Sequence, residues 1–307
     1  MHRRWITASA PRHARAGAML AAAMLLATPM HAPAVTPPVA DAAQDAGAVS
    51  GHAVPVEGFM RLEGSIAVGA DGRVTGYGLE QSGAVPAEVR AFVARQVAGW
   101  RVEFEDGVAP PAGPVPFGIR VRASPAGDGL YGLWMDGISL DEPLPPGHRL
   151  QAVHRHPAAY PRNMARVGAS GIVYMLAKVG TDGRVEDVFA EQVDLTAMPA
   201  DPADIVRYQL EFMASAASAI RRWRFKVPAE GPYAGAPQVL RVPVAFVMHG
   251  HETAYGEWEY LVRGVRMPPP WRSGVDDPAA QGDIAPSGVQ PARARMWVAR
   301  AADPGGG

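Results

Sequence analysis

The heptapeptide VGADGRV at residues 68–74 recurs as VGTDGRV at residues 179–185, which is 179 − 68 = 111 residues later. A Glu-Gln pair at 80–81 recurs at 191–192 with the same offset. The Asp-Gly step in each copy predicts a tight hairpin turn, because glycine accepts the positive φ that such turns require. Two such hairpins at a fixed spacing indicate two copies of one small unit.

The first copy is predicted at 56–124, in the order strand, strand, helix, strand. Apolar and polar residues alternate before the Asp-Gly turn, as in a half-buried strand. Pro86 suits the first turn of a helix. The apolar residues that follow are spaced by four, four and three along one helix face: Val89, Val93, Val97 and Trp100. Residues 115–121 are predicted to form the closing strand.

The second copy is predicted at 151–250, with hairpin strands at 173–179 and 184–192. Asp201 and Pro202 are predicted to begin its helix, because a carboxylate can accept from free amides and proline has no amide to leave unpaired. The predicted buried face of this helix comprises Val206, Leu210, Met213, Ala217 and Ile220. The aromatic residues at its end, Trp223 and Phe225, are predicted to be core residues.

These patterns predict two tandem copies of one unit built from strands and a helix. The Pro- and Gly-rich segments at 35–55 and 125–150 are predicted to be linkers, and 251–307 is predicted to be a mostly irregular tail. Stability must come from apolar cores, because the chain contains no cysteine and can form no disulfide.

Residues 1–34 are predicted to be an export signal. Arginines precede an apolar run over 17–30, and Ala32-Pro33-Ala34 has the spacing of a cleavage site. Cleavage there would release a periplasmic protein that begins at Val35. The alternative is a retained signal anchor, which would hold the protein at the inner membrane with its folded part in the periplasm.

The closing strand of the second copy, at 238–248, contains Pro243. Proline cannot donate a hydrogen bond to a neighbouring strand, so this strand is predicted to lie at a sheet edge or to carry a bulge. An edge strand offers unpaired backbone groups to an extended partner. Proline introduced at Val242 or Val244 is therefore expected to abolish pairing with such a partner.

The run from His156 to Met248 resembles the C-terminal domain of the TonB energy-transducer family. The features that match, in order, are Tyr160-Pro161, Gly168, Gly171, the Asp182-Gly183-Arg184-Val185 turn, Trp223-Arg224-Phe225, and a last strand with Pro243 and Phe246. The first copy keeps the DGRV turn, a tryptophan after the helix and a closing strand. It resembles a degenerate second example of the same domain.

The resemblance implies the α+β fold class, with a small three-stranded antiparallel sheet packed with helices in each of two tandem copies. It also implies that an extended segment of a partner adds as a strand beside the last strand of the domain. By that resemblance the partner is an outer-membrane receptor segment like a TonB box, and a proton-driven inner-membrane motor energises transport. The contact residues that it implies are Gln238, Val239, Leu240, Arg241, Val242, Pro243, Val244, Ala245 and Phe246. The alternative function is a soluble periplasmic binding or scaffold module without the motor, and a homodimer is left open.

No pattern in the sequence predicts an enzyme or a cofactor. GASG at 168–171 is not the G-x-S-x-G elbow of a serine hydrolase, and no phosphate-loop motif occurs. The histidine pairs 154/156 and 249/251 could share a metal ion, but solvated histidines are favoured because no acidic ligand accompanies them. Beyond residue 34 acidic residues outnumber basic ones, so no nucleic-acid partner is predicted.

Overall fold

The fold is described from a computed structural model. It describes residues 6–9, 56–127, 130–197, 199, 201–248, 253–271, 289–292 and 294–299, of which 6–9 and 127 are described by their backbone alone. All of these residues belong to one compact unit. Within them, no helix has the length and apolar character needed to span a membrane. The rest of the predicted export signal lies outside the described residues.

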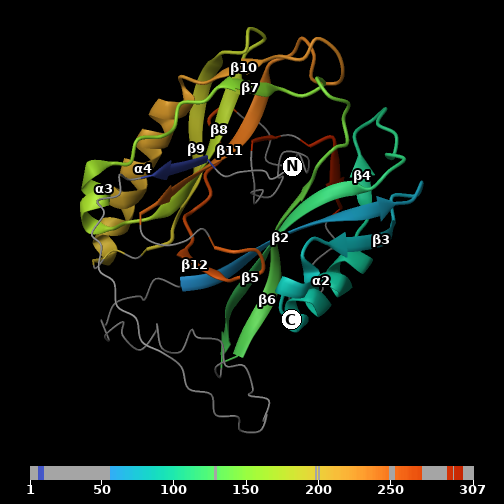
Figure 1. Ribbon diagram of the computed structural model, residues 1–307, viewed down its shortest axis with the longest axis horizontal. Coiled ribbons are helices and arrows are strands. Elements are labelled where there is room, and N and C mark those ends of the chain that lie inside the picture. Colours follow the sequence, from blue (N-terminus) through green and yellow to red (C-terminus); the bar gives the residue numbers. More distant parts are fainter. Residues whose placement is uncertain are drawn as a thin grey trace, which may run out of the picture. The chain divides into compact units, whose positions relative to one another are not determined.

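One large, nearly all-antiparallel sheet dominates the described unit (Figure 1). Its strand order is β1-β11-β8-β9-β12-β2-β5-β6, and β13 pairs with β11 while β3 pairs with β2. Only β1 runs parallel to its neighbour. The strands are β1 (Ile6–Ser9), β2 (Val56–Val68), β3 (Val74–Leu79), β5 (Val115–Gly127), β6 (Leu130–Leu140), β8 (Gly171–Val179), β9 (Val185–Leu195), β11 (Gln238–Val247), β12 (Glu259–Val262) and β13 (Gln290–Pro291).

The predicted fold class is therefore wrong, because the chain is mainly β and does not form small three-stranded sheets packed with helices. The physical reason is strand β12, which lies in the segment predicted to be a mostly irregular tail. It pairs with β2 along four residues and with β9 through Val262 and Leu195, so the strands of both copies join one sheet. The segment predicted to be a linker at 125–150 likewise contains β6, which extends the sheet beyond β5.

The helix of the first copy follows its predicted pattern. Helix α2 (Ala87–Ala98) begins directly after Pro86. Val89, Val93 and Val97 are fully buried, which confirms the predicted helix face. These valines share an apolar core with residues of β2 and β5.

The helical region of the second copy begins with the predicted cap. The carboxylate of Asp201 accepts a hydrogen bond from the amide of Ala203, 2.9 Å away, in a 3-10 turn over Pro202–Asp204. Helix α4 (Ile205–Ile220) follows that turn. A shorter helix, α3 (Arg162–Val167), precedes β8, and Figure 1 shows α3 and α4 beside the strands β8, β9 and β11.

The predicted buried face of α4 is wrong for its first half. Val206 and Leu210 are 62% and 56% exposed, whereas Tyr208 and Phe212 are buried. Apolar residues lie on several sides of this helix, so more than one of its faces could pack against the sheet. The larger aromatic side chains take the side facing the sheet, where they bury more surface.

The repeated Asp-Gly turns have the same backbone geometry. Gly72 and Gly183 have φ values of 80° and 76°. Each glycine carbonyl accepts a hydrogen bond from the short strand that follows the helix, from Val102 at 2.7 Å and from Phe225 at 2.9 Å. A Cβ atom on either glycine would overlap the carbonyl oxygen of that same strand residue. Both the turn and this close approach therefore require glycine.

Those two short strands each pair with another segment of the chain. β4 (Val102–Phe104) pairs with β14 (Met296–Val298), which lies near the end of the described residues. β10 (Arg224–Lys226) pairs with β7 (Gln151–His154). Extended segments of this chain thus add to strand edges in both copies.

Candidate functional site: the outer edge of strand β11

Strand β11 carries every residue that the sequence predicts to contact a partner. Leu240, Val242, Val244 and Phe246 are at most 3% exposed. The ring of Phe246 stacks on that of Phe212 in α4, with centroids 4.6 Å apart. The side chains of this strand are therefore committed to the protein core from Leu240 onward. A partner would meet mainly its backbone.

The other side-chain face of β11 is also occupied. Arg241 and Ala245 are 3% and 6% exposed, and Ala245 packs in a small cluster with Ile172 and Tyr174 of β8. Gln238 and Val239, at the start of the strand, are partly exposed. Both faces of the strand are thus covered, and only its outer edge remains to be considered.

The odd-numbered residues of β11 direct their backbone groups to the outer edge. The carbonyl of Val239 accepts a hydrogen bond from the amide of Ala292 at 2.7 Å, on the side away from β8. Because backbone groups alternate along a strand, those of Arg241, Pro243 and Ala245 point the same way. The nitrogen of Pro243 thus lies on the outer edge, where it removes no bond to β8.

Two short segments of the same chain occupy parts of this edge. β13 pairs antiparallel through Pro291 with Leu240 and through Gln290 with Arg241. β1 pairs in parallel with the four residues from Val244 to Val247. β11 is therefore not the terminal strand of the described sheet, although its outer side is covered only by short strands.

The first copy shows how an equivalent edge is covered completely. Val115 of β5 pairs with Ile66, and Leu240 of β11 pairs with Ala177, which lies 111 residues after Ile66. The outer edge of β5 matches that of β11 in this register. It holds the long antiparallel strand β6, paired at ten positions. The amide of Asp141 donates to the outward carbonyl of a proline there too, Pro116, at 2.8 Å.

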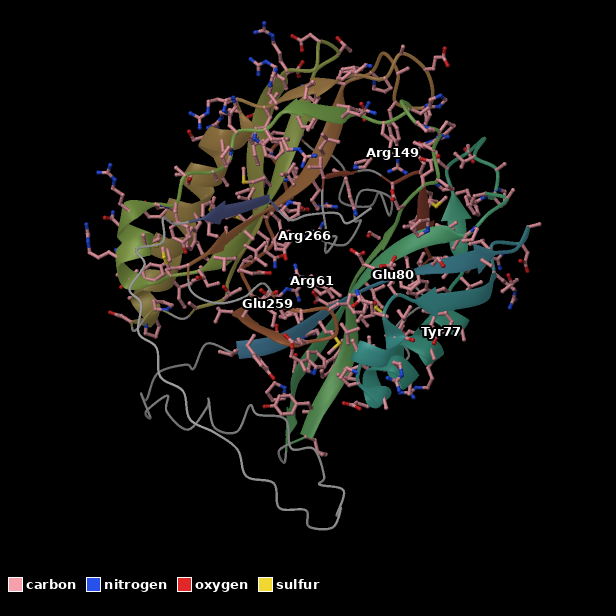
Figure 2. All side chains as sticks on the ribbon, in the orientation of Figure 1. Arg61, Tyr77, Glu80, Arg149, Glu259 and Arg266 are labelled. Atoms are coloured by element: carbon pink, nitrogen blue, oxygen red, sulfur yellow. The ribbon has the colours of Figure 1, made fainter. Side chains whose placement is uncertain are left out.

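A buried ion pair fixes β11 to the sheet. The guanidinium of Arg241 donates to both carboxylate oxygens of Glu191 on β9, at 2.7 and 3.0 Å. Arg266, labelled in Figure 2, binds the same carboxylate at 2.7 Å. Burial alone would raise the pKa of Glu191, but the hydrogen bonds and charges of the two arginines outweigh burial and lower it. Glu191 is therefore ionised and structural.

A second buried cluster joins the two copies. The guanidinium of Arg120 on β5 donates to Asp136 on β6 at 2.8 Å and to the hydroxyl of Tyr174 on β8 at 3.0 Å. It also lies 3.4 Å from the carboxylate of Asp194 on β9. Burial raises the pKa of Asp194, and the charge of Arg120 opposes that increase. The amide of Gly264, just after β12, donates to Asp194 at 3.0 Å.

This second cluster explains further why the two copies do not fold as separate sheets. The carboxylate of Asp194 would be costly to bury without a cation, and Arg120 of the first copy places a guanidinium 3.4 Å from it. Sequence reasoning missed both clusters, because each charged residue taken singly resembles a solvent-facing position in an alternating strand. The one available signal was the repeated Glu-Gln pair. Glu191 and Gln192 are 3% and 1% exposed, whereas the pair at 80–81 is exposed.

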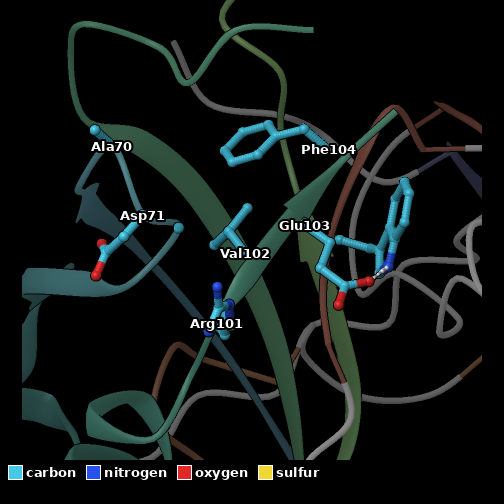
Figure 3. A pocket seen from close by; sticks show the side chains of 8 residues that line it. Ala70, Asp71, Arg101, Val102, Glu103 and Phe104 are labelled. Carbon is cyan, nitrogen blue, oxygen red and sulfur yellow. Dashed lines mark hydrogen bonds between the residues drawn. The ribbon is translucent and has the colours of Figure 1, made fainter. Parts of the chain in front are cut away.

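An open hollow of about 440 Å³ lies in the first copy (Figure 3). It is lined by the 70–72 turn, residues 101–104 and Trp297. The indole of Trp297 donates to the carboxylate of Glu103 at 3.0 Å. Its lining holds no pairing of a nucleophile with a base.

The described residues contain no group of three or more metal-ligating side chains. His154 and His156 are exposed, whereas positions 249 and 251 of the other histidine pair lie outside the described residues. Trp223 is fully buried and its indole donates to the carbonyl of His156 at 2.9 Å, which confirms its predicted place in the core.

No protein-family model, curated protein or solved structure with which the chain was compared matches it. The outer edge of β11 therefore stands as the candidate site on its own geometry.

Proposed function

We propose that this protein is a non-enzymatic binding module that takes up an extended segment of a partner protein as an added strand along β11. One observation carries the proposal. The equivalent edge of β5 holds a strand paired at ten positions, whereas the edge of β11 holds two short strands paired at four and two positions. A longer antiparallel strand on β11 would reproduce the arrangement of the first copy.

The chemistry of this edge favours recognition through the backbone. The outward amides of Arg241, Ala245 and Val247 and the outward carbonyls between them can pair with any extended peptide, whatever its sequence. Pro243 offers a carbonyl but no donor at the centre of the edge. Selectivity would come from alternate side chains of the partner, which would lie over the two covered faces of β11.

The resemblance of 156–248 to the TonB C-terminal domain supports an outer-membrane receptor segment as the partner. The pattern of 1–34 supports an envelope location. Cleavage after residue 34 would also remove β1 and leave Ala245 and Val247 open to a partner. The second candidate, a periplasmic module without a motor, fits the same edge, and the state of the N-terminus in the cell envelope distinguishes the two.

Amide hydrogen exchange tests the proposal directly. The chain beginning at Val35 would be incubated with a panel of extended peptides, including receptor N-terminal segments, and exchange would be followed residue by residue. Peptides that bind should protect the amides of Ala245 and Val247. The amides of Val242 and Val244, which face β8, are already bonded and serve as the internal control. Binding that protects other regions and leaves Ala245 and Val247 unchanged would refute strand addition at β11.

A further inference from the structure

The segment 289–299 touches both copies. Its first strand, β13, lies on β11, and its second strand, β14, lies on β4. We call the described residues of this segment, 289–292 and 294–299, the clasp. The clasp is therefore both a tether between the copies and an occupant of the proposed partner-binding edge.

The β14 end of the clasp is anchored firmly. Met296 is 2% exposed and belongs to the apolar core of the first copy. Arg295 contacts the carboxylates of Glu105 at 3.2 Å and Glu142 at 2.8 Å. Its carbonyl accepts from the amide of Glu105 at 2.8 Å, and the amide of Ala299 donates to the carbonyl of Arg101 at 2.7 Å. Apolar burial, ion pairs and backbone bonds all act at this end.

The β13 end has a shorter pairing. It pairs with β11 at two positions, and its backbone bond from Ala292 to Val239 extends that pairing by one residue. Pro291 lies opposite Leu240 and can donate no hydrogen bond. Ala292 is buried, and its side chain is a single methyl group. The end of the clasp with two paired positions thus lies on the proposed partner-binding edge, and the end with three paired positions and a core methionine lies away from it.

We propose that the clasp is a built-in competitor for the β11 edge: an incoming strand displaces β13 from Val239–Arg241 while β14 stays anchored on β4. Competition rests on the proposed function, whereas the detachment of β13 does not. Because the clasp is tethered to the protein, its effective concentration at β11 is high, on the order of mM for a short flexible linker. A partner strand must bind β11 more favourably than the tethered β13 does. The clasp therefore sets the minimum affinity that a partner needs.

The chain contains no cysteine, so a single engineered disulfide can lock the clasp reversibly. Val239→Cys with Ala292→Cys places the two thiols on directly opposed residues of neighbouring antiparallel strands, within disulfide reach. A second full-length variant carries a specific protease site between Gln281 and Gly282, so that the folded protein can be cleaved and its clasp, no longer covalently attached, exchanged for added peptide. The probe is a fluorescent peptide with the sequence of residues 289–299, VQPARARMWVA.

The expected result is an ordered series of peptide affinities. The cleaved protein should bind the peptide at least tenfold more tightly than the intact protein, and the oxidised disulfide variant should not bind it at the β11 edge. Reduction should restore the binding of the intact protein. Equal binding of the peptide by the cleaved, intact and oxidised proteins would refute the proposal that the clasp competes for the β11 edge.

The two proposals can fail separately. Exchange protection of Ala245 and Val247 by partner peptides that is the same in locked and reduced proteins would refute competition and leave strand addition intact. If the labelled clasp peptide binds as expected but partner peptides do not protect the amides of Ala245 and Val247, the proposed function is refuted. The proposal that β13 can detach from β11 would then still stand.

Discussion

Arg241 and Glu191 form a bidentate ion pair across the intervening strand β8, with nitrogen–oxygen distances of 2.7 and 3.0 Å. Both side chains are 4% exposed. Arg266 adds a further contact of 2.7 Å from the segment that follows β12. This pair therefore connects the candidate binding strand to the strand that carries the repeated Glu-Gln motif, and to the segment that joins the copies.

Replacing Arg241 with alanine should destabilise the protein by about 3–5 kcal/mol, because it leaves a buried carboxylate with only one partner. The matched control is Lys178→Ala on β8. Its ion pair with Glu186 has side chains that are 42% and 46% exposed, so its loss should cost less than about 1 kcal/mol. Urea unfolding followed by tryptophan fluorescence measures both. Similar losses in the two variants would show that the buried pair has no special role.

The ion pair also predicts a defined pH dependence. The pKa of Glu191 is lowered in the folded protein from its usual value of 4.5, so its ionised form stabilises the fold. That stabilisation is complete above pH 4.5 and is lost as the pH falls through the lower, folded pKa. The unfolding free energy of the unsubstituted protein should therefore exceed that of Glu191→Gln at pH 7, and the difference should shrink below pH 4.5.

The folded pKa of Asp194 is raised, so this residue makes the unfolding free energy change with pH in the opposite direction. Asp194 is present in both the unsubstituted protein and Glu191→Gln, so its contribution cancels when their unfolding free energies are subtracted. A difference that is constant from pH 7 to pH 3 would contradict the assignment of Glu191 as an ionised partner of Arg241.

Local structure was predictable where the sequence contained a single short-range pattern and no second pattern that favoured another arrangement. The hairpin turns followed from Asp-Gly, and the buried face of α2 followed from Val89, Val93 and Val97. In α4 the pattern failed, because Val206 and Leu210 compete with Tyr208 and Phe212 for the sheet. The spacing of apolar positions alone does not show which of two overlapping helix faces packs against the sheet.

The sheet was not predictable in the same way, because its continuity depends on contacts between distant segments. β12 is four residues long and has no strong strand pattern, yet it joins β2 to β9. Arg120 and Asp194 are 74 positions apart, and their contact requires both copies to be in place. Pro243 predicted an edge strand or a bulge, but β11 has neighbours on both sides. Its outer neighbours β1 and β13 were not predictable, since the predicted export signal and tail gave no sign of pairing.

Alanine at Gly183 should destabilise the fold more than alanine at Gly107. Both glycines have positive φ, 76° and 82°, so each substitution incurs the strain of a left-handed backbone, about 1–2 kcal/mol. Only at Gly183 would the new Cβ also overlap the carbonyl oxygen of Phe225, whereas nothing lies within 4 Å at Gly107. Thermal unfolding of the two variants separates the effects. A larger loss at Gly107 would mean that the close approach of β10 to the turn is dispensable.

Truncation of Trp223 to alanine should cost about 3–5 kcal/mol, because the side chain is fully buried and would leave a cavity. The comparison is Trp134→Ala on β6, whose side chain is 40% exposed and lies over Arg122. That change should cost about 1 kcal/mol or less, as for other partly exposed positions. Denaturant midpoints measured at constant m-value provide the test, and a reversed order would place Trp223 outside the core.

Proline substitutions along β11 distinguish the outer edge from the inner one. The amide of Ala245 points outward, so Ala245→Pro removes a donor for the partner and leaves the ladder to β8 unbroken. The amide of Val244 bonds to β8, so Val244→Pro breaks the core sheet instead. From the sequence alone, this substitution was expected to block only the pairing with a partner. Ala245→Pro should therefore remain folded by circular dichroism and lose peptide binding at least tenfold, whereas Val244→Pro should lose folding itself. A folded Ala245→Pro protein that binds its peptides undiminished would place the partner elsewhere than on the outer edge of β11.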